Sequence, residues 1–184
     1  MQCKVLIFNI NLTFNILCQA LYIFVLLQQN QWLMEFSPSK LNTFLFFKLP
    51  SAFWCGVRVK VITPEKCVAT VTHKWFNQNP FKSMYFAVQA MAAELTTGAL
   101  VMYQIKKSGK KISMLVANNK GNFCKKATGR VTFTCIDGSL IEEAIKKTIA
   151  TGEGQTFWMK SIGRDEKGEQ VSELDFEWSV RIKG

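Results

Sequence analysis

The chain has 184 residues, of which 48% are hydrophobic and 20% are charged, so it is long enough for one domain with a proper core and too short for two full domains. Its formal net charge of +10 favours anionic partners such as nucleic acid, a phosphorylated cofactor or an acidic membrane surface. A single histidine, His73, and six cysteines without CxxC spacing exclude a His-rich metal site, argue against metal catalysis and favour a reducing, cytoplasmic location.

Residues 1–33 differ in composition from the rest of the chain. They carry one charge, Lys4, in a run rich in Phe, Ile, Leu and Asn, and they lack the small-residue cleavage site of a signal peptide. The stretch 5–27 is long enough for a membrane anchor, although several Asn and Gln residues dilute it. We favour a third interpretation, in which translation starts at Met34 and the preceding residues are upstream sequence read in frame. Residues 34–184 are then the folded domain.

The first elements of this domain are a short helix and a hairpin. The amphipathic segment 36–53 predicts a small helix, with two serines available as caps and Pro50 as a stop. In 56–62, valines alternate with basic residues, and a second apolar run follows over 67–72 after the turn TPEK. This pattern predicts an antiparallel β-hairpin.

A long helix is predicted next. Apolar residues recur every three or four positions between Asn79 and Ile105, and most faces of the helix are apolar, which favours a central helix wrapped by other structure. Between Lys82 and Lys106 the only charged residue is Glu94. The segment is long enough to span a bilayer, but a carboxylate near its midpoint makes a soluble core helix the simpler account. Because a buried carboxylate must be paired, hydrogen-bonded or neutralised, Glu94 is either a satisfied structural group or a functional one.

Strands return after this helix. The segment 112–117 predicts a strand that is followed by the turn NNKG. The segment 130–135 is its predicted partner in a second hairpin. The spacing Ser139-x-x-Glu142 predicts a capped amphipathic helix. The alternation over 173–182 gives the clearest strand, expected to pair with 155–162 across RDEKG. Together these elements predict an α+β fold with one long buried helix and about six mostly antiparallel strands.

The head of the long helix carries a motif. Asn79-x-x-x-Ser83-Met84 followed by Glu94 resembles the thioesterase-like family of unknown function within the acyl-CoA thioesterase superfamily. The resemblance covers roughly Phe36 to Lys183. It implies the hotdog fold, in which an antiparallel sheet wraps a long central helix, and so assigns 34–184 as a hotdog thioesterase-like domain.

Two departures from the family pattern stand at the head of the helix. Related proteins tend to have His and Gly where this chain has Pro80 and Lys82. The side chain of Lys82 is expected to crowd a bound acyl group.

The resemblance implies a site. It places Glu94 as general base or nucleophile, and Asn79 either as a helix cap or as the group that holds the attacking water or the carbonyl. The thioester carbonyl is expected at the amino end of the helix, where unpaired N–H groups of Lys82, Ser83 and Met84 would stabilise an oxyanion. A structural role for Glu94, hydrogen-bonded to backbone or to a facing subunit, stays open beside the catalytic one.

Basic side chains are candidate contacts for the phosphates of coenzyme A, which enters as part of the substrate, with no separate cofactor expected. They are Lys106, Lys107, Lys110, Lys111, Lys125, Lys126 and Arg130. The resemblance also implies a homodimer or tetramer with sites at the subunit boundary.

Three functions remain to be distinguished. The first is an acyl-CoA thioesterase that uses the carboxylate of Glu94. The second is a non-catalytic acyl or acyl-CoA binding module, motivated by Pro80 and Lys82. The third, nucleic-acid binding, rests on net charge and interleaved aromatics without a recognised motif.

Overall fold

The computed structural model of the protein describes residues 36–183, so the predictions for 1–33 lie outside the described residues. The elements follow in the order α2 (Pro38–Lys48), α3 (Pro50–Trp54), β1 (Arg58–Ile62), β2 (Cys67–Thr72), η1 (Trp75–Asn77), α4 (Phe86–Ser108), β3 (Ile112–Phe123), β4 (Arg130–Cys135), α5 (Gly138–Thr151), β5 (Gln155–Arg164) and β6 (Gln170–Ile182). The predicted lead-in helix is thus two short helices, because Pro50 ends α2 and begins α3.

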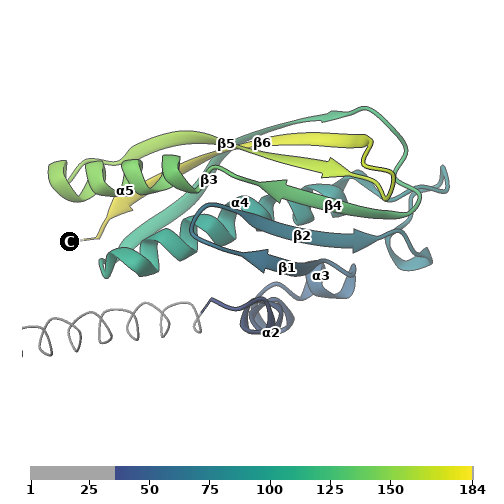
Figure 1. Ribbon diagram of the computed structural model, residues 1–184, viewed down its shortest axis with the longest axis horizontal. Coiled ribbons are helices and arrows are strands. Elements are labelled where there is room, and N and C mark those ends of the chain that lie inside the picture. The colour runs from purple at the N-terminus through teal and green to yellow at the C-terminus, as the bar shows by residue number, and fades with distance from the viewer. Residues whose placement is uncertain (1–35, 184) are drawn as a thin grey trace, which may run out of the picture. The chain divides into compact units, whose positions relative to one another are not determined.

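Six strands form one antiparallel sheet in the order β1-β2-β4-β5-β6-β3. The sheet curves around α4, and α2 and α3 lie beside β1 (Figure 1). This arrangement confirms the predicted α+β hotdog fold. Within residues 36–183, no helix is both long enough and apolar enough to cross a membrane.

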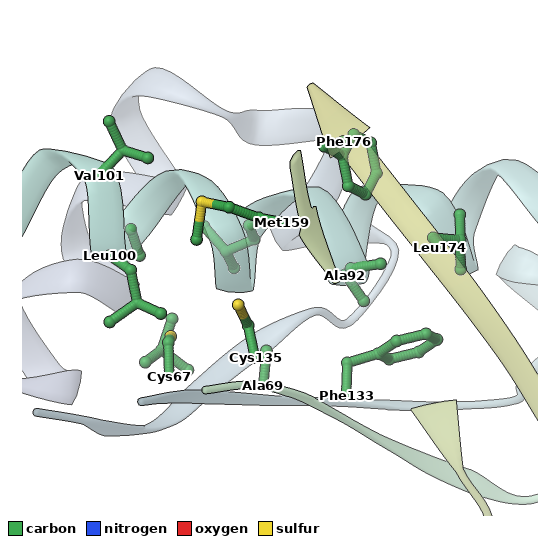
Figure 2. Close-up of a cluster of buried hydrophobic side chains, with 14 of the residues drawn as sticks. Cys67, Ala69, Ala92, Leu100, Val101, Phe133, Cys135, Met159, Leu174 and Phe176 are labelled. Carbon is green, nitrogen blue, oxygen red and sulfur yellow. The ribbon is translucent and has the colours of Figure 1, made fainter. Parts of the chain in front are cut away.

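The core lies between α4 and the sheet. Small side chains of α4, including Ala92, Ala93 and Ala99, are fully buried and let the strands approach the helix closely. Figure 2 shows Ala92 and Leu100 of α4 gathered with Phe133 of β4 and Phe176 of β6. The long helix is therefore buried for most of its length, as its apolar pattern predicts.

Two predicted hairpins are confirmed. β1 pairs with β2, with Arg58 opposite Thr70, and β5 pairs with β6 across the turn at 165–168. On β6 the apolar residues from Leu174 to Val180 are buried in alternation, so one face of this strand meets the core.

The predicted pairing of 112–117 with 130–135 is wrong. β3 pairs with β6, whereas β4 pairs with β2 and β5. The residues NNKG at 118–121 do not turn, because β6 is long enough to continue the ladder to Phe123, with a bulge after Val116. The next strand, β4, lies between β2 and β5, so β5 and β6 separate it from β3 in the sheet.

The predicted capping box on α5 is also absent. The N-cap of α5 is Asp137, two residues earlier than a box built on Ser139 requires. The carboxylate of Asp137 accepts a hydrogen bond from the backbone N–H of Lys160 at 2.8 Å, which fixes this corner against β5 instead.

The two edges of the sheet differ. At the β1 edge, the side chain of Asn42 on α2 donates to the carbonyl of Val59 at 3.0 Å and accepts from the N–H of Val59 at 2.9 Å. At the other edge, β3 runs for 12 residues, mostly exposed, and no described strand pairs with its outer side. The β3 edge is therefore the one that offers backbone groups for pairing.

Candidate functional site

The loop before α4 is a tight turn built on Asn79. The Oδ1 atom of Asn79 accepts hydrogen bonds from the N–H of Phe81 at 2.9 Å, the N–H of Ser83 at 3.3 Å and the hydroxyl of Ser83 at 3.2 Å. The helix begins only at Phe86, with Tyr85 as its N-cap, so the expectation that Asn79 caps the helix is wrong. Because Oδ1 is fixed in this way, the amide orientation is set, and Nδ2 has no hydrogen-bond partner among residues 36–183.

Lys82 adopts the left-handed conformation in this turn. Its φ is 56°, in the region that glycine enters freely and other residues enter at a cost. The preference of related proteins for glycine near this point therefore has a backbone reason. The side chain of Lys82 is exposed and is absent from the lining of the neighbouring pocket.

The unpaired N–H groups lie further along the chain than predicted. The N–H of Lys82 donates to the carbonyl of Asn79 at 3.1 Å, and the N–H of Met84 donates to the carbonyl of Ala127 at 2.8 Å. After Lys82, the first N–H groups that have no acceptor among the described residues are those of Phe86 and Ala87, the first two residues of α4. The positive end of the helix dipole lies at these two groups.

A pocket of about 480 Å³ opens beside this end of α4. Its lining combines the 79–86 turn and the first turn of the helix with the 123–127 connection after β3: Asn79, Pro80, Phe81, Ser83, Met84, Tyr85, Phe86, Gln89, Phe123, Cys124, Lys125, Lys126 and Ala127. The structure thus brings the predicted site residues Asn79, Ser83 and Met84 together in one pocket. Aromatic walls with a few polar groups are typical of a pocket for a small organic ligand.

Gln89 is a pocket residue that sequence analysis did not select. It is only 4% exposed, and its Nε2 donates to the carbonyl of Met84 at a long 3.5 Å. Its Oε1 is buried and has no hydrogen-bond partner. A buried acceptor without a donor is costly, so Gln89 marks a place where a ligand donor would bind. The only signal in the sequence was a polar residue in an apolar helix, one turn after Tyr85.

Glu94 lies more than one helical turn beyond Gln89, the pocket residue furthest along α4. Eight residues separate it from Phe86, which corresponds to about 12 Å along the axis, and it does not line the pocket of its own chain. Its Oε1 lies beside Gly98, one helical turn further along α4. A Cβ atom built on that glycine would be 3.3 Å from this oxygen. The indole ring of Trp178 occupies the same place and donates through Nε1 to the hydroxyl of Thr97 at 3.0 Å.

The carboxylate of Glu94 is half-buried and has no hydrogen bond or ion pair within residues 36–183. Burial therefore raises the pKa of Glu94 above its ordinary value of 4.5. It lies on the face of α4 that the sheet leaves half-exposed, together with Ala87, Ala90 and Met91. Further along the same side of the helix, Thr97 and Gly98 are buried, so the accessible part of this face ends near Glu94.

Lys106 and Lys107 lie at the opposite end of α4. Twenty residues separate Lys106 from Phe86, or about 30 Å of helix. The Nζ of Lys107 is 3.4 Å from Glu142 Oε2, and Lys107 lines a separate pocket of about 220 Å³ between α4 and α5. Within one chain these two lysines do not meet the pocket at Asn79.

Two other predicted phosphate contacts do line the pocket. Lys125 forms ion pairs with Asp165, at 2.7 Å, and with Glu169, and these hydrogen bonds raise the pKa of Lys125. Lys126 is exposed and forms no ion pair with a described residue. Of the lysines at the pocket, Lys126 is therefore the one available to an anionic ligand.

Comparison with protein families places the described domain. Residues 39–180 match the model of a family described as a domain of unknown function, DUF4442. No curated protein is similar enough in sequence to match the chain.

The fold is similar to those of solved thioesterase structures. A Pseudomonas aeruginosa protein of unknown function, described as a probable thioesterase, has a TM-score of 0.68 at 21% identity and covers 80% of this chain and 97% of that one. A Haemophilus influenzae thioesterase has a TM-score of 0.60 at 14% identity, covering 79% and 91%. The PaaI protein from the phenylacetic acid degradation operon of Escherichia coli has 0.57 at 14% identity, covering 76% and 89%. At these identities the likeness establishes the hotdog fold.

Proposed function

Because this chain belongs to the DUF4442 family and has the fold of the thioesterases named above, we propose that it hydrolyses an acyl thioester, with an acyl-CoA as the first candidate substrate. The observation that carries the proposal is the surplus of hydrogen-bonding groups at one pocket. The N–H of Phe86, Nδ2 of Asn79 and Oε1 of Gln89 belong to pocket residues and lack a partner among residues 36–183. The N–H of Ala87, the next residue of α4, also lacks one, although Ala87 does not line the pocket.

The amino end of α4 would hold the thioester carbonyl. Two backbone N–H groups, at Phe86 and Ala87, and the helix dipole favour negative charge on the carbonyl oxygen in the transition state. Nδ2 of Asn79 is a third donor, in an orientation fixed by the three bonds to its Oδ1. These groups replace Lys82 and Met84 as oxyanion donors, whereas Ser83 and Met84 remain as pocket lining.

Gln89 and Lys126 would bind the thiol half of the substrate. The free Oε1 of Gln89 requires an N–H or O–H donor, and the amide N–H groups of the pantetheine arm supply one. Lys126 lines the same pocket and suits a phosphate. Lys106 and Lys107 would reach this ligand only from another subunit.

Glu94 would act across a subunit boundary. A second copy that pairs with the open β3 edge would extend the sheet and approach the half-exposed face of α4, near Trp178 of the adjacent β6. The family resemblance implies sites at such a boundary. In this homodimer, the carboxylate of one subunit serves the pocket of the other.

The chemistry then balances without a cofactor. The Glu94 carboxylate takes a proton from water as the water oxygen attacks the carbonyl carbon, and the resulting oxyanion is held by the helix N–H groups. The carbon–sulfur bond breaks, and the departing sulfur takes the proton from Glu94. The products are a free acid and a thiol.

Release of free thiol from a panel of acyl-CoA thioesters by the full chain tests this function. The Glu94→Gln variant should lose turnover, and Glu143→Gln, a change on α5 away from the pocket, should keep it. Light scattering measures the oligomeric state of both. Equal turnover by the parent and Glu94→Gln would end the catalytic role of Glu94, and a strictly monomeric active protein would end the shared site.

A non-catalytic acyl or acyl-CoA binding module is the second candidate. The distance of Glu94 from the pocket of its own chain favours it, because a binding module needs only the pocket groups. Saturable binding of acyl-CoA without thiol release, measured by calorimetry, would establish it.

A further inference from the structure

An exposed aromatic cluster covers α2 and α3. The ring of Phe46 lies 4.8 Å from that of Phe47, 5.1 Å from that of Phe53 and 6.5 Å from that of Trp54, with interplanar angles of 85°, 79° and 51°. Phe47 is 70% exposed and Trp54 is 65% exposed. Contiguous aromatic surface of this kind is unusual in water and marks an interaction site.

Helix α2 carries both buried and exposed apolar side chains. Leu41 and Leu45 are buried against the core, whereas Phe44 and Phe47 lie on the surface. Lys40 and Lys48 share the outer face with these two phenylalanines, because the spacing 40, 44, 47, 48 follows the helical repeat. The outer face therefore carries two aromatic and two cationic side chains.

A second aromatic pair lies next to this cluster. Trp75, 82% exposed, and Phe76 belong to the short turn η1. Nδ2 of Asn77 in the same turn donates to the carbonyl of Cys55, the residue after Trp54, at 2.9 Å. The turn is thus tied to the end of α3, and its aromatic rings extend the surface. We call these residues of α2, α3 and η1 the aromatic–cationic surface.

The charge of this region has one sign. From residue 36 to 64 there are four basic residues and no acidic residue. From 36 to 93 there are seven basic residues, and Glu65 is the single acidic one. Most acidic residues lie in the C-terminal half of the chain, so the segment that contains α2, α3 and η1 carries a net positive charge.

We propose that the aromatic–cationic surface docks on an anionic lipid membrane, lying at the interface without crossing it. Phenylalanine and tryptophan rings insert at the headgroup level, and lysines on the same face meet lipid phosphates. A symmetric pairing of this surface with a second copy would set its lysines against one another, which disfavours that occupant. The edge-to-face rings form a continuous apolar surface, unlike the separate flat platforms that stack nucleic-acid bases.

Vesicle sedimentation with the full chain tests the proposal. The probes are phosphatidylcholine vesicles with and without about 30% phosphatidylserine, at low salt and at about 0.5 M salt. The test variant is Phe47→Ser with Trp54→Ser. The control is Ile136→Ser with Trp158→Ser, which removes a similar exposed apolar pair outside the surface. Residues 1–35 are present in every protein, so differences between variants report the aromatic–cationic surface.

The parent and the control should bind phosphatidylserine vesicles, less so at high salt, and the test variant should bind at least about tenfold more weakly. Equal binding by the test variant and the control would overturn the proposal, and so would the absence of vesicle binding by the parent. A change of oligomeric state in the test variant would assign the surface to a protein contact. Loss of binding to a labelled single-stranded oligonucleotide by that variant would assign the surface to nucleic acid. Either result would also overturn the proposal. Thioester hydrolysis in solution is measured separately, so its presence or absence does not decide this result.

Discussion

Two glutamines on α4 have the same burial and opposite hydrogen bonding. Gln104, near the carboxyl end, is 3% exposed, and its Nε2 donates to the carbonyls of Pro64 at 2.9 Å and Gly138 at 3.3 Å. Gln89, in the first turn, is 4% exposed and leaves Oε1 without a donor. The first glutamine ties three segments together. Gln89 has an unused acceptor, Oε1, at a pocket. The difference separates a polar group that holds the fold together from one that is available to a ligand.

The same division applies along the helix. Beyond the first turn, Thr96 bonds to the carbonyl of Ala93 and to Ser161, and Thr97 accepts from Trp178. Glu94 is the exception in this satisfied region, since its carboxylate has no described partner. That exception is the reason to place it in a reaction.

The largest effect is expected at Glu94. Replacing it by glutamine keeps the shape and removes the base, so kcat for thioester hydrolysis should fall by about 10²–10⁴-fold. Steady-state kinetics with the preferred acyl-CoA measure this. An unchanged kcat would show that Glu94 has a structural role and not a catalytic one.

Gln104→Met should lower the free energy of unfolding by about 1–3 kcal/mol, because the carbonyls of Pro64 and Gly138 lose their donor. Urea denaturation checks this value. Turnover per folded molecule should not change. A silent substitution would show that this polar contact contributes nothing to the fold.

Gln89→Met is the matched change at the other end of α4. It removes an acceptor that has no donor, and it also removes the long 3.5 Å hydrogen bond from Nε2 to the carbonyl of Met84. Because these two effects oppose each other, the free energy of unfolding should change by less than about 1 kcal/mol. The affinity for the acyl-CoA should fall about tenfold, because the pantetheine donor loses its acceptor. Destabilisation equal to that of Gln104→Met would erase the distinction between the two glutamines.

The pH dependence of stability should report the carboxylate of Glu94. Burial holds the pKa of Glu94 above its ordinary value of 4.5, so the folded state binds this proton more tightly than the unfolded state. The resulting stabilisation is complete below the unfolded-state value and is lost as pH rises through the folded-state value. Glu94→Gln should therefore gain stability relative to the parent as pH rises above the ordinary value of 4.5. A pH-independent difference would show that the group is not desolvated.

The smallest effect is expected at Lys82→Gly. Relief of the left-handed conformation and the greater freedom of glycine in the unfolded chain oppose each other, so stability should change by no more than about 1 kcal/mol. Thermal unfolding measures the shift. A large loss would mean that the lysine side chain itself holds the turn.

Periodicity in the sequence predicted the elements well where apolar spacing decides them. The helix, the β1–β2 hairpin and the β5–β6 hairpin follow from local patterns. The pairing of β3 does not, because Asn and Gly at 118–121 favour a turn locally and only the long partner β6 keeps them extended.

The site was predicted in part. Asn79, Ser83 and Met84 meet in the pocket as the family motif implies. The free N–H groups were misplaced, because the start of α4 depends on tertiary bonds such as Met84 to Ala127, which no local pattern encodes. Gln89 was missed for a related reason: whether a buried amide is satisfied depends on the acceptors that folding brings to it.

The bond pair between Asn42 and Val59 limits how the molecule can assemble. The side chain of Asn42 occupies both outward backbone groups of Val59 on β1, which hinders the addition of a strand at that edge and favours addition at β3. Two copies that pair through β3 would leave only their β1 edges outward, where this bond pair opposes further growth of the sheet.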